Sequence, residues 1–358
     1  MRKVMMIMLA AAIAGCSDGA APSSKPASAL PQWQTLSGGP PLVIAHRGAS
    51  GYRPEHTLEA YKLAIEMGAD VVEPDLVVTK DGVLVARHDR YLSTTTNVAD
   101  KPEFADRKKP DPDPNGDGRE DWWVEDFTLA ELKTLGARQP RDARSKEFDD
   151  QFEIPTFDEM LALVSEEADK AGRQVGVYPE TKHPGYFASI GLDFKAPLLA
   201  ALNDFDAGPV FIQSFEPGIL KRLKGKTEAH LVQLVFEPEP NAGVNMQPVD
   251  IARYADGIGA QKTIVTENYD GSFAPFGSKR GENFIKSAHD LNLFVHVWTM
   301  RDDEGYPPLD FKGEQAYSDA IPIAFQYRSV FSAGVDGVFA DFPDTSVKAR
   351  TDHAPKRR

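Results

Sequence analysis

Two histidines lie in one short region of the chain, and each follows an apolar run of the kind that forms a buried strand. His46 comes after Leu42–Ala45, and His88 ends the segment Val83–His88. Histidine is the side chain best matched to proton transfer near neutral pH, so two on one rim can act as base and acid. A single histidine is more often a surface or structural group, but the joint placement of these two favours catalysis.

Carboxylates follow two further strand-like runs. Glu73 and Asp75 are two positions apart at the end of Val71–Leu76, so they point to the same face of a strand. Buried carboxylates this close repel each other unless a cation or a proton lies between them. A third, Glu180, follows Val175–Tyr178. Ligands that are all oxygen favour Ca²⁺ or Mg²⁺ over zinc. The alternative, in which one carboxylate faces solvent and pairs with a surface lysine, fits an apolar strand less well.

Two cations lie beside these groups. Arg47 directly follows His46, and Lys182 is two residues beyond Glu180. Either could hold a phosphate oxygen, although a structural salt bridge is the alternative role for Arg47. Three side chains at the ends of later strands are candidates for the pocket wall or, for the two aromatic ones, equally for the core: Gln213, Phe215 and Trp298.

The strands that must position these residues recur along the chain. Continuous β-branched runs are typical of strands covered on both faces. The eight candidates are Leu42–Ala45, Val71–Leu76, Val175–Tyr178, Val210–Gln213, Leu231–Val235, Asp256–Ala260, Phe294–Trp298 and Val335–Phe339. Helical patterns alternate with them: Thr57 to about Met67, Thr128–Leu135, Thr156–Ala168, Pro197–Leu202, Glu216–Leu223 and Gly281–Asp290. The alternation predicts an α/β fold with a closed (β/α)₈ barrel. A doubly wound open sheet is the alternative, but no glycine-rich dinucleotide motif follows the first strand.

One connection is too short for a parallel crossover. Only Thr79–Gly82 separates the second strand from the segment that ends at His88, and its Asp-Gly pair predicts a β-hairpin. Pairing that is symmetric about Asp81 places His88 opposite Pro74, and therefore beside the two carboxylates.

The stretch from about 90 to 150 is predicted to be an insertion. Pro110–Gly118 is polar and rich in turn residues. Asp111, Asp113 and Asn115 resemble the start of an EF-hand calcium loop, but its twelfth position is Trp122 instead of the bidentate glutamate. A solvated loop is therefore favoured over a second calcium site.

The N-terminus is typical of a bacterial lipoprotein signal. A basic start is followed by the apolar run Val4–Ala14. The end of this run overlaps Ile13–Cys16, which matches a lipobox; an ordinary secretory signal is the alternative. We expect a signal peptide over 1–15, lipidation of Cys16 and a flexible tether over 16–37. The domain is expected over 38–350, with a tail over 351–358. Ser17 after the cysteine predicts retention at the outer membrane, on the periplasmic side.

Composition narrows the partners. Cys16 is the only cysteine, which excludes a disulfide within the chain and a thiolate metal cluster. The formal charge of −14 argues against nucleic acid as a partner, and an anionic substrate would need a local cluster of cations or a metal. The membrane is therefore expected as a partner through the lipid anchor alone, and the sequence does not indicate an oligomeric state.

Seven motifs occur in a fixed order between about residues 40 and 348: His46-Arg47-Gly48, Pro54–Thr57, Glu73-x-Asp75, His88-Asp89, Glu180-x-Lys182, Val297–Thr299 and Asp336–Pro343. This series resembles the glycerophosphodiester phosphodiesterase family, most closely its periplasmic branch. The resemblance implies a TIM barrel and a divalent cation, Ca²⁺ in that branch, with Mg²⁺ as the alternative. The matching positions are Glu73, Asp75 and Glu180 for the cation, His46 and His88 for acid/base catalysis, and Arg47 and Lys182 for phosphate.

The implied reaction is hydrolysis of a small glycerophosphodiester, such as a deacylated phospholipid headgroup, to glycerol 3-phosphate and an alcohol. Water or the substrate's own 2-hydroxyl could be the nucleophile, and the order of the two proton transfers stays open. His56 stands where the family often has Asn, which bears on substrate preference. The alternatives are a lysophospholipase D-type enzyme and a non-catalytic surface-binding lipoprotein, but a pure binder has no need of the metal and histidine positions.

Overall fold

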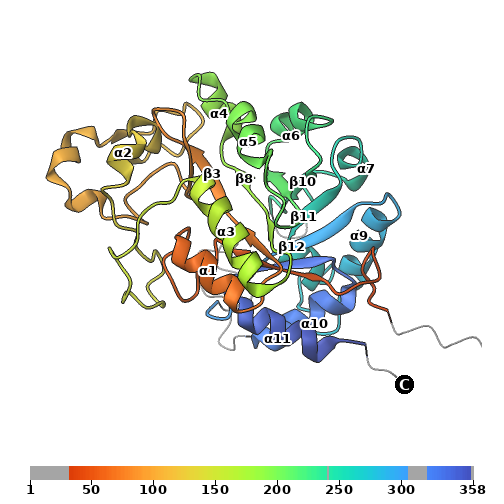
Figure 1. Ribbon diagram of the computed structural model, residues 1–358. Coiled ribbons are helices and arrows are strands. Elements are labelled where there is room, and N and C mark those ends of the chain that lie inside the picture. Colours follow the sequence, from red (N-terminus) through yellow and green to blue (C-terminus); the bar gives the residue numbers. More distant parts are fainter. Residues whose placement is uncertain (1–31, 240–241, 305–320, 356–358) are drawn as a thin grey trace, which may run out of the picture. The chain divides into compact units, whose positions relative to one another are not determined.

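The computed structural model describes residues 32–239, 242–304 and 321–355. The predicted signal peptide, Cys16, most of the tether and the end of the tail lie outside these residues. Within them, parallel strands form the staves of a barrel, with helices around it (Figure 1). No described helix combines the length and the apolar character needed to cross a bilayer.

All eight predicted runs are strands, and they confirm the predicted barrel. They form β1 (Leu42–His46), β2 (Val71–Glu73) with β3 (Asp75–Val78), β7 (Gly176–Val177) with β8 (Glu180–Thr181), β9 (Phe211–Ser214), β10 (His230–Val235), β11 (Gly257–Gln261), β12 (Phe294–Met300) and β13 (Gly337–Ala340). Strand β1 pairs in parallel with β2 on one side and with β13 on the other. The first and last strands therefore close the ring.

Two positions in the barrel are each occupied by a pair of short strands separated by a proline; the first pair was predicted as one continuous strand, Val71–Leu76, and the second extends beyond the predicted run Val175–Tyr178. Pro74 separates β2 from β3, and Pro179 lies between β7 and β8. Proline has no N–H to donate, so regular pairing stops there. The carbonyls still accept, from Glu180 N to Pro74 O at 2.9 Å and from Gln213 N to Pro179 O at 2.9 Å. The ring thus continues through both breaks, directly beside the carboxylates.

The predicted hairpin is confirmed in its register. Strand β4 (Leu84–Ala86) runs antiparallel to β3, with Leu76 opposite Ala86 and Val78 opposite Leu84. The pairing is symmetric about Asp81. A further backbone hydrogen bond, from Arg87 N to Asp75 O over 2.9 Å, extends this pairing to the rim of the barrel. His88 is therefore delivered next to the second stave.

The predicted helices are present with small differences in their ends. They are α1 (Leu58–Glu66), α2 (Leu129–Leu132), α3 (Phe157–Ala171), α5 (Lys195–Leu202), α6 (Pro217–Leu223) and α9 (Lys279–His289). Thr57 caps α1 as predicted, accepting a hydrogen bond from Ala60 N. Within the described residues, five further helices were not predicted: α4 (Pro184–Ser189), α7 (Pro248–Ile251), α8 (Lys262–Thr266), α10 (Ile323–Ala333) and α11 (Pro343–His353). The first three are short, and α11 buries only Pro343 and Ser346.

The insertion packs onto the barrel. It contains the short helices η1 (Val98–Asp100), η2 (Pro102–Arg107) and η3 (Val124–Asp126), the two-stranded pair β5 (Lys109–Pro110) and β6 (Glu120–Asp121), and α2. Trp122, Val124 and Phe127 join the main hydrophobic core. In the loop that resembles an EF-hand, Asp111 forms an ion pair with buried Arg90. That aspartate therefore fixes the loop to the base of the insertion.

The folded domain extends beyond its predicted limits, residues 38 and 350, at both ends. The Trp33 ring contacts Phe331 and His353, with centroids 6.1 and 5.9 Å apart. Leu36 N donates to Asp336 Oδ1 over 2.6 Å. The last turns of the predicted tether thus belong to the folded unit, as does the end of α11, because both cover an apolar edge.

Candidate active site

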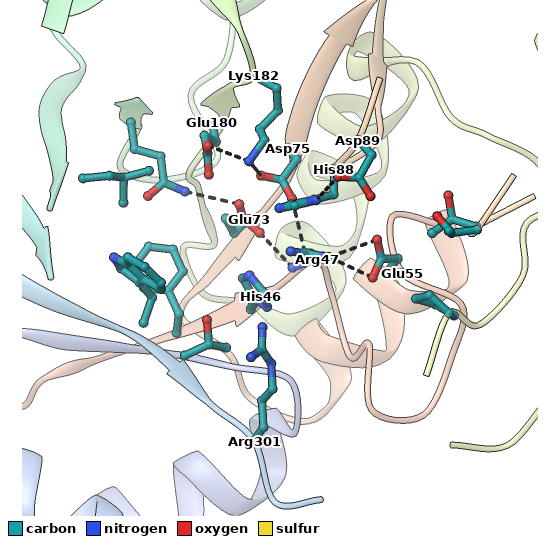
Figure 2. A pocket seen from close by; sticks show the side chains of 18 of the residues that line it. His46, Arg47, Glu55, Glu73, Asp75, His88, Asp89, Glu180, Lys182 and Arg301 are labelled. Atoms are coloured by element: carbon teal, nitrogen blue, oxygen red, sulfur yellow. Dashed lines mark hydrogen bonds and ion pairs between the residues drawn. The ribbon is translucent and has the colours of Figure 1, made fainter. Parts of the chain in front are cut away.

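A cavity of about 470 Å³ opens where the strands end. Every predicted site residue that the structure describes lines it: His46, Arg47, Glu73, Asp75, His88, Glu180, Lys182, Gln213, Phe215 and Trp298. Figure 2 shows the labelled charged groups converging on one centre. Cys16, the predicted lipidation site, lies outside the described residues.

Three carboxylates meet at the bottom of this pocket. Oxygen atoms of Glu73, Asp75 and Glu180 all lie within 4.8 Å of one another, and all three side chains are buried. Glu73 and Asp75 are each 1% exposed, which rules out the alternative in which one faces solvent. They sit together because β2 and β3 flank Pro74, while β8 begins with Glu180 and pairs with β3.

Burial and mutual repulsion perturb the three acids. The pKa of Glu73 lies well above its usual value, through burial first and then through Asp75 and Glu180. Burial raises the pKa of Glu180 to about 7, although Lys182 opposes the shift. For Asp75, burial also acts upward, but Lys182 and His88 outweigh it and hold the pKa well below its usual value. The potential metal ligands here are all carboxylate oxygens, and they concentrate negative charge in a buried position. Such a site suits a hard divalent cation.

A hydrogen-bonded pair supports this triad from behind. His56 Nε2 lies 3.0 Å from Asp75 Oδ2, and His56 Nδ1 lies 2.8 Å from the Tyr61 hydroxyl. Burial lowers the pKa of His56 to about 4, so the ring is neutral at pH 7. The network assigns the proton to Nε2, which donates to Asp75, while Tyr61 donates to Nδ1. The sequence assigned His56 no role beyond replacing an Asn that is frequent in the family, and in the structure it supports Asp75.

Arg47 is held against the triad by its own backbone and by two acids. Its N–H donates to Glu73 Oε2 over 2.8 Å. Its guanidinium pairs with both Glu55 oxygens at 3.1 and 3.0 Å, and its Nε lies 3.2 Å from Asp75 Oδ2. The salt-bridge role is therefore observed. Arg47 also lines the pocket, where its contact with a phosphate stays a prediction. Glu55 belongs to one of the sequence motifs but had no predicted role.

Lys182 and Gln213 complete the surroundings of the triad. Lys182 Nζ donates to Glu180 Oε1 over 2.9 Å and lies 3.8 Å from Asp75 Oδ1. Gln213 Nε2 donates to Glu73 Oε1 over 3.2 Å, while its own Oε1 is buried without a hydrogen-bond partner. The side-chain oxygen of Gln213 is therefore a further buried oxygen beside the three carboxylates. A bound cation, or a water molecule in its hydration shell, could be the missing partner of this oxygen.

His46 is oriented by an aspartate from the far end of the chain. Its Nδ1 lies 2.6 Å from Asp341 Oδ1. Burial lowers the pKa of His46 to about 4, with Arg47 acting in the same direction and Asp341 opposing. The neutral ring thus donates from Nδ1 to Asp341 and keeps the lone pair on Nε2 available for a proton.

His88 has the same type of support from its neighbour. Its Nδ1 lies 2.8 Å from Asp89 Oδ1, and its side chain is 32% exposed, compared with 12% for His46. In the view of Figure 2, Arg47 lies between the two imidazoles. The two rings line the same pocket, and each has one nitrogen fixed by a carboxylate.

The structure adds residues that sequence reasoning did not assign. Asp341 Oδ2 accepts from Arg144 Nη2 over 2.5 Å and from Arg301 Nε over 3.2 Å. Burial raises the pKa of Asp341, but Arg301 and His46 outweigh it, and the net pKa is well below the usual value. Asp341 carried a signal, since it lies within the last motif. Arg144 carried none, because it lies in a polar stretch.

The aromatic candidates form one side of the pocket. The Phe215 and Trp298 rings meet edge to face, with centroids 5.8 Å apart, and Phe215 is 38% exposed. Trp298 Nε1 donates to Gly259 O over 3.0 Å. Of the two predicted roles, pocket wall and core, the structure supports the wall.

Comparison with known proteins agrees with this geometry. Residues 46–345 match the model of the glycerophosphoryl diester phosphodiesterase family. Glycerophosphodiester phosphodiesterase GDPD6 of Arabidopsis thaliana is 34% identical over 84% of this chain and 84% of its own length. The Haemophilus influenzae glycerophosphodiester phosphodiesterase is 30% identical over 86% of this chain and 89% of its own.

Solved structures share the fold. A putative glycerophosphoryl diester phosphodiesterase from Silicibacter pomeroyi superposes with a TM-score of 0.64 at 20% identity, covering 91% of this chain and all of its own. An Oleispira antarctica phosphodiesterase, solved with the product sn-glycerol-3-phosphate, gives 0.57 at 22% identity, covering 87% and 96%.

Proposed function

Because the chain belongs to the glycerophosphoryl diester phosphodiesterase family and is an enzyme of that class, we propose that it cleaves small glycerophosphodiesters with the help of a divalent cation and two histidines. One observation carries this proposal. A buried group of three carboxylates lies in the same pocket as two imidazoles, each with its Nδ1 fixed by an aspartate.

The products would be glycerol 3-phosphate and a free alcohol. The Oleispira phosphodiesterase binds sn-glycerol-3-phosphate as a product. A cavity of about 470 Å³ suits a ligand of that size. Its lining is crowded with charged groups, which favours a small charged diester over a lysophospholipid. Membership of an enzyme family speaks against a purely binding role.

Glu73, Asp75 and Glu180 would hold the cation, with Ca²⁺ proposed first and Mg²⁺ second because hard ions take oxygen ligands. Such an ion would neutralise charge on the phosphate and make a nearby hydroxyl more acidic. Lys182 and Arg47 supply positive charge on the protein side of the same space, so the diester is held between cations.

The proton transfers are proposed to use His46 and His88. Burial keeps His46 neutral at pH 7, which favours it as the group that accepts a proton from the attacking hydroxyl. His88, the more exposed of the two, would donate a proton to the leaving alcohol. Asp341 and Asp89 would each stabilise the imidazolium form of their partner. Water or the glycerol 2-hydroxyl can fill the place of the nucleophile.

We also propose that Cys16 carries a lipid that holds the enzyme on the periplasmic face of the outer membrane. The lipobox-like sequence that ends at Cys16, with Ser17 after it, supports this location. The enzyme would then meet glycerophosphodiesters released outside the cytoplasm.

The proposed activity is tested with the full chain purified in detergent. Glycerophosphocholine is the substrate, and a coupled assay detects glycerol 3-phosphate. We expect turnover that a chelator removes and that added Ca²⁺ or Mg²⁺ restores. Undiminished turnover in excess chelator would contradict the cation proposal, and no turnover with either ion would contradict the activity itself.

A further inference from the structure

The insertion supplies a polar side of the active-site pocket. Tyr91, Thr94, Thr95, Pro140 and Arg141 all line the cavity, and all five belong to residues 90–150. We call this set the insertion wall. The phosphate-binding and metal-binding candidates come instead from barrel strands and the loops directly after them. The insertion wall is thus available to contact a part of the substrate other than the phosphate.

Contacts on both sides of Arg141 hold this wall in place. Gln139 Nε2 donates to Ser50 O over 2.9 Å and to Arg53 O over 3.2 Å. Arg144 Nη1 donates to the same Ser50 O over 3.0 Å, and its Nη2 pairs with Asp341 at 2.5 Å. The backbone that carries Arg141 is therefore already fixed when a ligand arrives, which lowers the entropic cost of binding.

In the part of the chain that the structure describes, Arg141 lies among cations and has one distant carboxylate partner. Among the described residues, its ion-pair partner within 4 Å is Glu304, whose Oε1 lies 3.8 Å from Nη1. Glu304 is shared with Lys262 at 3.4 Å and with Arg301 at 3.3 Å. Burial, and next the charge of Arg301, lower the pKa of Arg141. An anion at this position would relieve that crowding of cations.

We propose that Arg141 binds a negatively charged group on the alcohol moiety of the substrate, so that the enzyme favours glycerophosphodiesters with an anionic headgroup. This inference rests on the proposed phosphodiesterase function. A guanidinium binds a carboxylate or a phosphate through a fork of two N–H donors. Arg47 and Lys182 are the residues proposed to bind the phosphate, so Arg141, on the insertion wall of the same pocket, is assigned to the part of the substrate that varies.

A cationic headgroup fits this pocket less well. The aromatic side offers Phe215 as a ring on which a quaternary ammonium could lie, but Lys182 Nζ already stands 5.9 Å from that ring's centre. A second cation there would be repelled by Lys182. The charge distribution on both sides therefore favours an acidic group.

Two substrates that differ by one carboxylate test the proposal. Glycerophosphoserine and glycerophosphoethanolamine share the glycerol, the phosphate and the ammonium. With Arg141→Gln we expect kcat/KM for glycerophosphoserine to fall about tenfold through a higher KM, the size of one charge-assisted hydrogen bond. The value for glycerophosphoethanolamine should stay unchanged. Arg141→Lys should retain part of the preference, because the charge remains and the fork is lost.

Lys108→Gln is the matched control, since it removes one positive charge from an exposed site on the same insertion. It should leave both substrates unaffected, and thermal unfolding should show that every variant is folded. An equal loss for both substrates in Arg141→Gln would overturn the proposal, because Arg141 would then act on the common part. The absence of any loss for glycerophosphoserine in Arg141→Gln would overturn it too. If the wild-type enzyme hydrolysed neither substrate, the proposed function itself would fail.

Discussion

Arg144 in the insertion and Asp341 after the last barrel strand form a buried ion pair, with 2.5 Å between Nη2 and Oδ2. The other oxygen of Asp341 lies 2.6 Å from His46 Nδ1. One carboxylate thus ties the insertion to the histidine proposed as the base. If His46 is the base, the insertion helps to set the position of a catalytic group as well as forming part of the pocket wall.

Arg144→Ala should damage both stability and turnover. It leaves Asp341 buried with one cation fewer, which is expected to lower the free energy of unfolding by about 3 kcal/mol. The same change should loosen His46 and lower kcat/KM for glycerophosphocholine by at least about tenfold, since catalytic groups tolerate little misplacement. Urea titration and steady-state kinetics measure the two effects.

The matched control is Arg138→Ala. Arg138 makes a two-pronged pair with Asp150 at 2.8 and 2.7 Å, but this pair is exposed and within the insertion. Its removal should cost less than about 1 kcal/mol and leave kcat/KM unchanged. Equal effects of the two substitutions on kcat/KM would show that the link to His46 is unimportant.

The protonation of Asp341 should give stability a defined pH dependence. Its native pKa is held well below the usual value, mainly by Arg301 and His46 against the effect of burial. The contribution of the ionised Asp341 carboxylate to the free energy of unfolding is therefore fully present above the unfolded-state pKa of about 4. It is lost as the pH falls from there through the lower native-state pKa. The difference in melting temperature between wild type and Asp341→Asn should be large at pH 7 and shrink below about pH 4. A difference that stays constant down to about pH 3 would contradict the assignment.

Loss of either histidine proposed to be catalytic should remove turnover without unfolding the protein. We expect His46→Ala and His88→Ala each to lower kcat by about 10²- to 10⁴-fold, the range for a general acid or base. His230→Ala is the control, because His230 is exposed at the start of β10, at the opposite end of the strand from the pocket. Circular dichroism and glycerol 3-phosphate release provide the two readouts. Near-normal turnover in either pocket variant would refute the two-histidine assignment.

Cation binding should also be visible without any substrate. An ion that binds the folded state alone adds about 2.7 kcal/mol of stability at 100 times its dissociation constant. Added Ca²⁺ should therefore raise the melting temperature of the chelator-treated protein, and Glu180→Gln should abolish that rise. Asp113→Asn, in the loop that resembles an EF-hand, should leave it intact. The opposite pattern would move the cation site to the insertion.

The proposed location of the enzyme depends on one side chain, that of Cys16. Cys16→Ser should shift the protein from the membrane fraction to the soluble fraction of a bacterial envelope preparation, since a lipidated cysteine is the proposed attachment. Sucrose-gradient fractionation with immunodetection distinguishes inner from outer membrane. Retention of the Cys16→Ser variant with membranes would exclude the lipid anchor.

Local patterns were sufficient to predict the barrel and much of the pocket. Strands covered on both faces appear as continuous apolar runs, and the Asp-Gly turn at Asp81 set the register of His88 correctly. Residues that end strands meet at one rim by the geometry of a parallel barrel. Glu180, about a hundred residues after Glu73, could therefore be grouped with it from the sequence alone.

Partners chosen by long-range packing could not be predicted in this way. Arg144 lies in a polar stretch, and nothing in its neighbourhood indicates that it will reach Asp341. The support of Asp75 by His56 and Tyr61 depends on how α1 docks beneath the rim. Helix α11 was missed because its sequence carries no apolar stripe: Pro343 and Ser346 are its buried residues, and Val347 and Ala349 are only partly buried against the core.

The pairing of β1 with β13 has a consequence for biosynthesis. His46 is among the first folded residues to leave the ribosome, and the aspartate that orients it is 295 residues behind. A nascent or truncated chain that lacks the final strand cannot close the barrel. It also cannot orient the His46 imidazole. We therefore expect turnover to begin only after the whole domain has been made and folded.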